Sequence, residues 1–555
     1  MILSTQDIER ARFFYDAGFW RADTMYVHLR KLAAQAPDRP FVRDAHRRLT
    51  RGEALRRVDA IAADLHRSGL RPGDRVSIWL PSRVESVLIL LACSRMGYVA
   101  NTSLHRDYTT AEIAALLDRA GSRALFAQPG YGADADRTSI EAFRETLPRL
   151  TALRWLAPSG EPQDDLPEEE VDLPFSTSPD RVMYLAFTSG TTGLPKGVMH
   201  SDNTLLANGR AITLDWRFDE ATVVYTLSPM SHNMGTVALV TVLTCGGELV
   251  VHAPADSDTT LRRVVETGAT YLVGVPTHAI DLLVAAERAG LQRLGRVAAF
   301  QLAGSAIPSE VAERLIGLGV TPQNTFGMTE NCSFQYTRPD DPRDVIVNSC
   351  GRSCDGFELT IWSQEDPNRE VEQGEIGELG GRGACLMLGY FDDQKATESS
   401  FNIHGWFMTG DLGRLDAEGN VQIVGRKKDL IIRGGHNLHP ARIEDLAMRH
   451  PAVLKTAVFP VPDPRLGEKA CIAIVMRDDA RIDPDELLAH LDREGLSRYD
   501  MPEYFMAMTS LPVTASGKVL KRALVEMVRA GDIAPLPIRW RGPAPQTKND
   551  EGDVT

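Results

Sequence analysis

Strand-like segments that lead directly into helix-like segments recur along this chain. Three such pairs are residues 73–80 with 82–96, residues 270–276 with 277–290, and residues 297–304 with a helix that runs from Pro308 and Ser309 to near Gly319. In such an alternation each helix covers a face of a parallel sheet, because a parallel pair of strands needs a crossover connection. The pattern therefore predicts an α/β fold built of parallel layers.

The length and the local composition predict more than one domain. At 555 residues the chain exceeds a single ordinary domain. An acidic, proline-containing connection (161–180) and a region of short strands broken by glycines (347–425) interrupt the α/β pattern. The prediction is a large N-terminal body (1–425) of layered α/β subdomains plus a β-rich subdomain, a small α+β C-terminal domain (426–541), and a disordered polar tail (542–555).

Charge and cysteine content bear on partners and location. The formal net charge of −14 opposes nonspecific binding to nucleic acid or to an anionic membrane. The seven cysteines lack a paired metal spacing, and the close pair Cys350 and Cys354 has no nearby histidine, so we expect reduced structural thiols. The N-terminus has no apolar core of a signal peptide, and apolar runs such as Val87–Cys93 are too short to cross a membrane. We therefore expect a cytoplasmic protein without a membrane span.

The segment from Tyr184 to His200, YLAFTSGTTGLPKGVMH, is the most informative in the chain. A strand runs into a loop of serine, threonine and glycine that ends in a lysine, and such a loop can wrap backbone N–H groups and hydroxyls around phosphates. It differs from a Walker A loop, which has Gly-Lys-Ser/Thr, because Pro195 precedes Lys196 and Gly197 follows it. The segment resembles the phosphate-binding signature of the acyl-adenylate-forming superfamily, which includes acyl-CoA synthetases, adenylation domains of peptide synthetases and firefly luciferase. The resemblance implies nucleotide contacts at Ser189, Gly190, Thr191, Thr192, Gly193 and Lys196, and a catalytic role for Thr188.

Further motifs of the superfamily follow in the same order. In NTFGMTE, Phe326 stands where the family has an aromatic ring stacked on adenine, and Thr329 matches a phosphate contact. Glu330 matches the carboxylate that holds Mg²⁺, with Thr188 as a second metal contact. Alone, Phe326 would more often be a core residue and Glu330 a solvated surface charge. Their spacing to the other motifs favours the nucleotide-binding interpretation instead. The same resemblance implies nucleotide contacts at Gly304, Ser305, Ala306, Gly327 and Met328.

The C-terminal motifs imply two half-reactions. Asp411 matches an acceptor for both ribose hydroxyls, and Arg426 matches a second nucleotide contact. Lys518 matches the family's last motif, where a mobile point charge can sit between the carboxylate and the α-phosphate. The resemblance implies that the C-terminal domain rotates about a hinge at Lys428, which withdraws Lys518 after adenylation. The narrow pantetheine arm would then pass two residues without side chains, Gly434 and Gly435.

The resemblance implies an enzyme that consumes ATP, a small carboxylic acid and CoA, with Mg²⁺, and forms acyl-CoA, AMP and pyrophosphate. Amino-acid-activating relatives carry an aspartate in the fourth motif, whereas here His232 occupies that stretch, which favours an acid without an α-amino group and a pocket wall or gate at His232. No carrier-protein domain follows the last motif, which favours free CoA. The local sequence around these motifs is most similar to that of bacterial ligases for alicyclic or medium-chain acids, such as cyclohexanecarboxylate:CoA ligases.

Other interpretations stay open. An aryl-CoA ligase for benzoate-like acids and an acyl-AMP ligase that loads a separate carrier protein share these motifs. A catalytically silent nucleotide-binding protein is disfavoured because Lys518, Glu330, Thr188 and Asp411 are all present. The oligomeric state is also open, a homodimer included.

Overall fold

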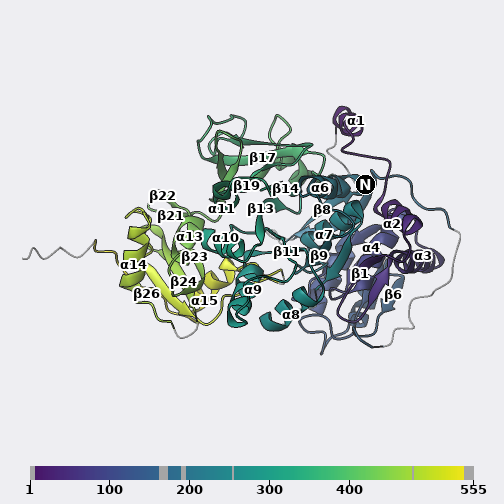
Figure 1. Cartoon of the computed structure of the whole chain (residues 1–555), viewed down its shortest axis with the longest axis horizontal. Helices are drawn as coiled ribbons and strands as arrows, with labels where there is room; N and C mark the ends of the chain where they lie inside the picture. The colour runs from purple at the N-terminus through teal and green to yellow at the C-terminus, as the bar shows by residue number, and fades with distance from the viewer. Residues whose placement is uncertain are drawn as a thin grey trace, which may run out of the picture. The chain divides into compact units, whose positions relative to one another are not determined.

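The computed structural model describes residues 7–161, 173–188, 195–252, 256–477, 480–514 and 516–542. The predicted phosphate contacts Ser189, Gly190, Thr191, Thr192 and Gly193, and the predicted tail beyond Gly542, lie outside these residues. The chain divides into two compact units (Figure 1). The large unit comprises the described residues within Met1–Ile307, Val311–Ile423 and Thr514–Lys518, and the small unit those within Pro308–Glu310, Val424–Val513 and Val519–Thr555.

One sheet of the large unit carries the strand that leads into the predicted phosphate loop. In spatial order its strands are β18 (Gly389–Tyr390), β8 (Lys196–Ser201), β7 (Val182–Thr188), β4 (Val99–Asn101), β3 (Arg75–Trp79), β5 (Ser122–Ala127) and β6 (Ala152–Trp155). The strands from β7 to β6 are parallel, whereas β8 and β18 are antiparallel to their neighbours. Ligands of parallel sheets bind at the carboxyl ends of the strands, and β7 ends there at Thr188.

A second sheet of the large unit is also mainly parallel. In spatial order its strands are β15 (Arg352–Ser353), β14 (Cys332–Tyr336), β13 (Thr321–Met328), β12 (Ala299–Leu302), β11 (Tyr271–Gly274), β9 (Val223–Thr226), β10 (Glu248–Val251), β1 (Pro40–Arg43) and β2 (Arg48–Thr50). The strands from β13 to β1 are parallel. The predicted strands at 270–276 and 297–304 are β11 and β12, which pair directly, so their carboxyl ends and following loops are neighbours.

Helices between the two sheets form the centre of the large unit (Figure 1). These are α4 (Val84–Met96), α6 (Asp202–Asp215) and α7 (Asn233–Cys245). α4 packs on β3 and β4, α7 packs on β9, β10 and β11, and α6 touches β7, β8 and β14. Every residue of α4 is buried, which explains why its sequence is apolar on all sides. The helix ends where Gly97 takes the left-handed conformation, with φ of +70°.

The other helices before residue 400 either precede the first strand or connect strands. They are α1 (Ile8–Asp16), α2 (Met25–Gln35), α3 (Arg51–Arg67), α5 (Thr110–Ala120), the 3₁₀ helix η1 (Ile140–Thr146), α8 (Ser257–Glu266), α9 (Pro276–Arg288), α10 (Ser309–Gly317), α11 (Arg343–Asn348) and α12 (Gln394–Ser399). The three predicted strand–helix pairs are therefore confirmed as β3 with α4, β11 with α9, and β12 with α10. Pro276 at the first turn of α9 fits because a proline there gives up no intrahelical hydrogen bond.

The predicted β-rich region is confirmed as a separate sheet. Its strands are β16 (Phe357–Trp362), β17 (Gly377–Gly383), β19 (Phe407–Leu415) and β20 (Val421–Arg426), in that spatial order. The glycines of β17 are required by packing, because a Cβ on Gly380 would collide with the indole of Trp362 on the neighbouring strand.

The small unit is α+β, as predicted. Its sheet contains β22 (His436–Leu438), β21 (Ile431–Arg433), β24 (Gly467–Met476), β25 (Tyr504–Met508) and β26 (Leu536–Pro537), with β23 (Val453–Asp463) also paired to β24, and its helices are α13 (Pro440–Met448), α14 (Pro484–Arg493) and α15 (Lys521–Ala530). Just before α15, Val519 forms an antiparallel bridge with Val513.

The cysteines of the described chain are buried in the interior as free thiols. All seven cysteines are buried and free of disulfides, and burial raises the pKa of Cys350 to about 12. Such thiols stay protonated and act as small apolar side chains. Among the described helices, none is both long and apolar enough to cross a membrane.

Candidate active site

The predicted phosphate loop joins two antiparallel strands. β7 ends at Thr188 and β8 begins at Lys196, and these two residues face each other in the ladder. The Thr188 hydroxyl donates to the carbonyl oxygen of Lys196 over 3.4 Å. In a Walker A loop the chain enters a helix, whereas here it returns as a strand. The hairpin therefore brings Thr188 and Lys196 together at the carboxyl end of β7.

Glu330 joins this pair through a tyrosine that no sequence motif indicated. The Tyr390 hydroxyl donates to Glu330 Oε1 at 2.9 Å, and Lys196 Nζ lies 4.7 Å from the centroid of the Tyr390 ring. Glu330 is only 7% exposed. Burial and the neighbouring Glu330 carboxylate raise the pKa of Tyr390, so the phenol remains a donor. Two predicted residues, Lys196 and Glu330, thus contact Tyr390, and Thr188 faces Lys196 in the ladder.

A histidine of β8 also contacts the Thr329–Glu330 segment. His200 Nε2 is 2.7 Å from the carbonyl oxygen of Thr329, and its Nδ1 is 3.0 Å from the Thr204 hydroxyl. A carbonyl only accepts, so His200 carries its proton on Nε2. Burial lowers the pKa of His200 to about 4, which keeps the ring neutral. The imidazole is therefore a fixed structural link between the predicted phosphate segment and Thr329.

The predicted adenine-stacking residue lies in a tight hairpin. Phe326 is 9% exposed, and its ring packs edge-on against Phe334 with centroids 5.6 Å apart. Gly327 follows in β13, where a Cβ would collide with the carbonyl oxygen of Cys332 on β14. The Met328 amide donates to Asn331 Oδ1 at 3.0 Å and closes the turn. Gly327 is thus required by the hairpin itself, and the hairpin sets the position of Phe326.

Lys518 lies in a loop that belongs to the large unit. The Thr277 hydroxyl donates to the carbonyl oxygen of Gly517 at 2.7 Å. Gly517 has φ of +84°, and a Cβ there would lie 3.1 Å from Val275 Cγ2. A Cβ on Gly304, with φ of +88°, would lie 3.5 Å from Val275 Cγ1. The loops that follow β11 and β12 therefore meet the Lys518 loop at Val275, and two further predicted residues, Ser305 and Ala306, are exposed in the loop after β12.

His232 lies at the start of α7, close to the charge of Lys518. Its Nδ1 accepts from the Met234 amide at 3.3 Å. Burial, and then the charges of His105 and Lys518, lower the pKa of His232 to about 4. His105 was not singled out by any motif. Its Nδ1 is 2.9 Å from the Ser231 hydroxyl, and burial lowers its pKa to about 4. Both imidazoles are therefore neutral, and His232 is the one that lies near Lys518.

Asp411 is buried in β19 of the large unit. Asp411 is 4% exposed, and its backbone amide donates to the Thr409 hydroxyl at 3.1 Å. A carboxylate in this setting offers acceptors only, which fits a pair of hydroxyl donors.

The small unit holds the predicted hinge and the two path glycines. Arg426 ends β20, and Lys428 follows in a turn where the Asp429 amide donates to the Arg426 carbonyl oxygen at 3.1 Å. Gly434 and Gly435 form the turn between β21 and β22, with φ of +58° and +89°. A Cβ on Gly435 would have no heavy atom within 4 Å, so this turn borders open space.

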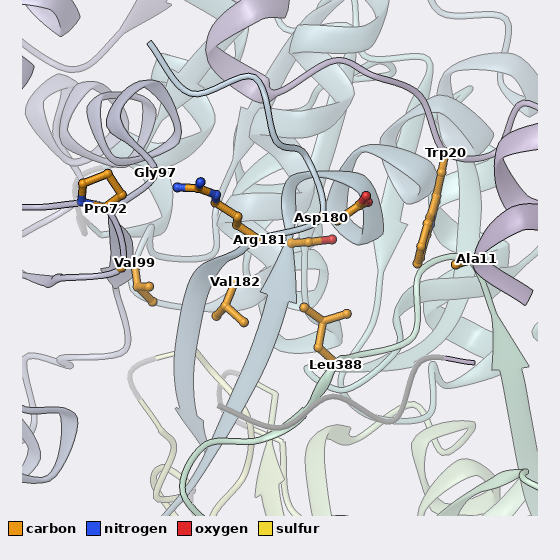
Figure 2. A pocket seen from close by; sticks show the side chains of 11 residues that line it. Ala11, Trp20, Pro72, Gly97, Val99, Asp180, Arg181, Val182 and Leu388 are labelled. Carbon is orange, nitrogen blue, oxygen red and sulfur yellow. The ribbon is translucent and has the colours of Figure 1, made fainter. Parts of the chain in front are cut away.

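A pocket of about 520 Å³ lies at the opposite edge of the first sheet (Figure 2). Its walls include Val99 and Val182 at the amino ends of β4 and β7, together with Trp20, Arg181 and Leu388. Among the described residues that line it, none is a predicted site residue. Because β7 reaches the candidate site at its other end, this pocket is separate from that site.

Comparisons with known proteins agree with the arrangement. The profile of the family "AMP-binding enzyme" matches residues 29–391, and that of the "AMP-binding enzyme C-terminal domain" matches residues 442–518. The chain is 31% identical to the 2,3-dihydroxybenzoate-AMP ligase of Bacillus subtilis, over 94% of this chain and 96% of that one. It is 28% identical to the medium-chain fatty-acid–CoA ligase of Escherichia coli, over 92% of each chain. The solved structure of ATP-bound MatB from Rhodopseudomonas palustris is similar with a TM-score of 0.78 and 27% identity, over 91% of this chain and 99% of that one.

Proposed function

Because the chain belongs to the AMP-binding enzyme family of adenylate-forming acyl- and aryl-CoA ligases, we propose that its substrate is an apolar, compact carboxylic acid of the alicyclic or medium-chain class. The protein is an acid–thiol ligase, which forms acyl-CoA, AMP and pyrophosphate from an acid, ATP and CoA. The E. coli relative named for medium-chain fatty acids supports the aliphatic choice.

The observation that carries this choice is the uncharged composition of two segments near the Lys518 loop. Residues 229–235 (PMSHNMG) and 301–307 (QLAGSAI) contain no acidic or basic side chain except His232, whose pKa is lowered to about 4. His232 of the first segment lies near Lys518, and Gly304 of the second segment approaches Val275, which also faces Gly517 of the Lys518 loop. A second ionic group on the acid would lose its hydration there without gaining a counter-charge, which costs several kcal/mol. Dicarboxylates and amino acids should therefore be poor substrates.

In the adenylation step a carboxylate oxygen attacks the α-phosphorus of ATP, and the bond from that phosphorus to the pyrophosphate oxygen breaks. Lys518 offsets the negative charge that builds where the two anions meet. Lys196, at the mouth of the β7–β8 hairpin, contacts the phosphates. Asp411 accepts hydrogen bonds from the ribose hydroxyls, and the ring of Phe326 stacks on adenine.

Glu330 and Thr188 would hold Mg²⁺ together with the phosphates of the nucleotide. A buried carboxylate and a threonine hydroxyl suit this ion, because Mg²⁺ takes few protein ligands and completes its shell with phosphate and water. Within the described residues, no group of three or more His, Cys, Asp or Glu side chains forms a metal cage, which fits a site that the substrate completes. When bound, the ion would screen the charge of the departing pyrophosphate.

In the second step the CoA thiol attacks the carbonyl carbon of the acyl-adenylate, and AMP leaves. We place the hinge for the preceding domain rotation at Lys428, after Arg426 at the end of β20. Gly434 and Gly435 would line the path of the pantetheine arm, which is supported by the free space at Gly435, where an added Cβ would meet no heavy atom within 4 Å. The rotation would also remove Lys518, which this step does not need.

Matched pairs of acids test the substrate class. Pyrophosphate release should be faster with octanoate than with suberate, which adds a second carboxylate to a chain of equal length, and faster with cyclohexanecarboxylate than with phenylalanine. Acyl-CoA should accumulate only when CoA is present. A preference for the dicarboxylate or the amino acid would contradict the proposal.

An aryl acid is the second candidate. It is favoured by the 31% identity to the ligase named for 2,3-dihydroxybenzoate. Benzoate and cyclohexanecarboxylate differ mainly in ring flatness and electron distribution, so their ratio of kcat/KM decides between the two candidates. Release of pyrophosphate without any acyl-CoA, when CoA is supplied, would instead indicate transfer to a carrier protein.

A further inference from the structure

Tyr390 contacts two residues that the proposed function uses for opposite charges. Its hydroxyl donates to Glu330 Oε1 at 2.9 Å, and the Lys196 ammonium lies over its ring, 4.7 Å from the centroid. Tyr390 is 5% exposed and Glu330 is 7% exposed. A single buried side chain therefore lies between the predicted metal carboxylate and the predicted phosphate lysine.

The backbone makes this arrangement rigid. β18 pairs with β8 so that Tyr390 faces Val198. Lys196 is two residues before Val198 in the same strand and so projects from the same face, diagonal to Tyr390. Backbone hydrogen bonds on either side of Tyr390 tie its segment to the chain next to Lys196 and to Glu330. The Phe391 amide donates to the Gly197 carbonyl oxygen and the Met387 amide donates to the Glu330 carbonyl oxygen, each at 2.6 Å.

The chemistry of the contacts suits orientation rather than catalysis. A glutamate carboxylate can rotate, and a hydrogen bond to one oxygen restricts the direction in which the carboxylate presents its remaining lone pairs. The phenol is the donor in this contact, because a carboxylate oxygen only accepts. The negative face of the ring attracts the ammonium group of Lys196.

We propose that Tyr390 is a positioning residue for adenylation, whose hydroxyl orients the Glu330 carboxylate toward the metal–nucleotide complex while its ring holds the Lys196 ammonium. The proposal rests on the proposed function, since it needs Glu330 as a metal ligand. Tyr390 itself would touch neither the nucleotide nor the acid.

Tyr390→Phe removes the hydroxyl and keeps the ring, so it tests the Glu330 contact alone. Binding of Mn²⁺ in the presence of α,β-methylene-ATP, followed by the electron paramagnetic resonance signal of free Mn²⁺, should weaken about tenfold, as expected for loss of one hydrogen bond to a charged group. The KM for the carboxylic acid should stay unchanged. Tyr390→Leu should in addition weaken binding of the nucleotide, because the contact with Lys196 is also lost.

A double-mutant cycle separates orientation from folding. In a Glu330→Gln background, Tyr390→Phe should have no further effect on Mn²⁺ affinity, because the carboxylate that it orients is absent. A general loss of stability would lower affinity in both backgrounds, and that result would overturn the proposal.

Tyr26→Phe is the matched control. Tyr26 is 3% exposed, and its hydroxyl donates to Asp59 at 2.9 Å, on α2 and α3. It should leave Mn²⁺ affinity unchanged while it shifts the urea midpoint by an amount similar to Tyr390→Phe. Equal loss of Mn²⁺ affinity in both variants, or no loss in Tyr390→Phe, would overturn the proposal. If the unmodified enzyme releases no pyrophosphate with any acid, the proposed function fails, and that outcome is visible before any variant is made.

Discussion

Replacing Lys518 with alanine should separate the two half-reactions. Lys518 lies close enough to His232 to contribute to the lowered pKa of that imidazole. His232 and His105 are neutral there, with pKa values of about 4, so they cannot substitute for the ammonium group when carboxylate and α-phosphate meet. The variant therefore removes a positive charge from the point where negative charge builds.

The magnitude follows from the setting. Two unit charges about 4 Å apart interact by about 4 kcal/mol at an effective dielectric constant of about 20. Removing a group that stabilises charge in the transition state costs roughly 2.7–4 kcal/mol, which corresponds to about 10²–10³ in rate. Adenylation in Lys518→Ala should fall by at least about 10²-fold, whereas thioester formation from supplied acyl-AMP and CoA should be nearly unchanged.

Single-turnover measurements check both steps, with pyrophosphate release for adenylation and acyl-CoA formation for transfer. Lys521→Ala is the matched control, because Lys521 lies three residues further on and pairs with Glu444 at 2.6 Å. It should leave both steps at the rate of the unmodified enzyme. Equal slowing of the two steps by Lys518→Ala, or equal effects of the two lysine variants on adenylation, would refute the reasoning.

Three further predictions follow from the site and the buried histidines. Gly435→Leu should slow thioester formation at least tenfold relative to Gly435→Ala, because both variants bear the strain of φ at +89° but only leucine fills the pantetheine path. Pyrophosphate release should be equal in the two variants. Equal rates of thioester formation would argue against the path. Asp411→Asn should raise the KM for ATP by about 10–100-fold, because an acceptor for charged hydrogen bonding is lost, and initial rates at saturating acid measure it. The free energy of unfolding should fall as pH decreases from about 6.5 toward 4, because burial lowers the pKa of His200 to about 4 in the folded protein and the unfolded chain takes up the proton first. His200→Gln should flatten that dependence in urea titrations at pH 7 and pH 4.5, and an unchanged slope would count against it.

The sequence by itself determined the fold class and the family. The change of hydrophobic period between strands and helices is a local property, and it placed β3 with α4, β11 with α9 and β12 with α10. Glycine-broken strands in 347–425 likewise predicted the β-rich sheet, because a glycine such as Gly380 is needed where a bulky neighbour crosses the strand. The motifs needed no structure to be recognised, although the roles of Lys518, Asp411, Lys428 and the two path glycines stay predictions until the variants are measured.

Only the tertiary structure decided which residues stand beside those motifs. Tyr390 reaches Glu330 and Lys196 because β18 pairs with β8, and that pairing joins segments nearly two hundred residues apart that carry no signal of it in their sequence. His105 reaches His232 in the same way, through the loop after β4 and the start of α7. Strand partners are chosen by the burial of whole faces and by the closure of distant loops, so the side chains that orient a catalytic group come from whichever strand packs next to it.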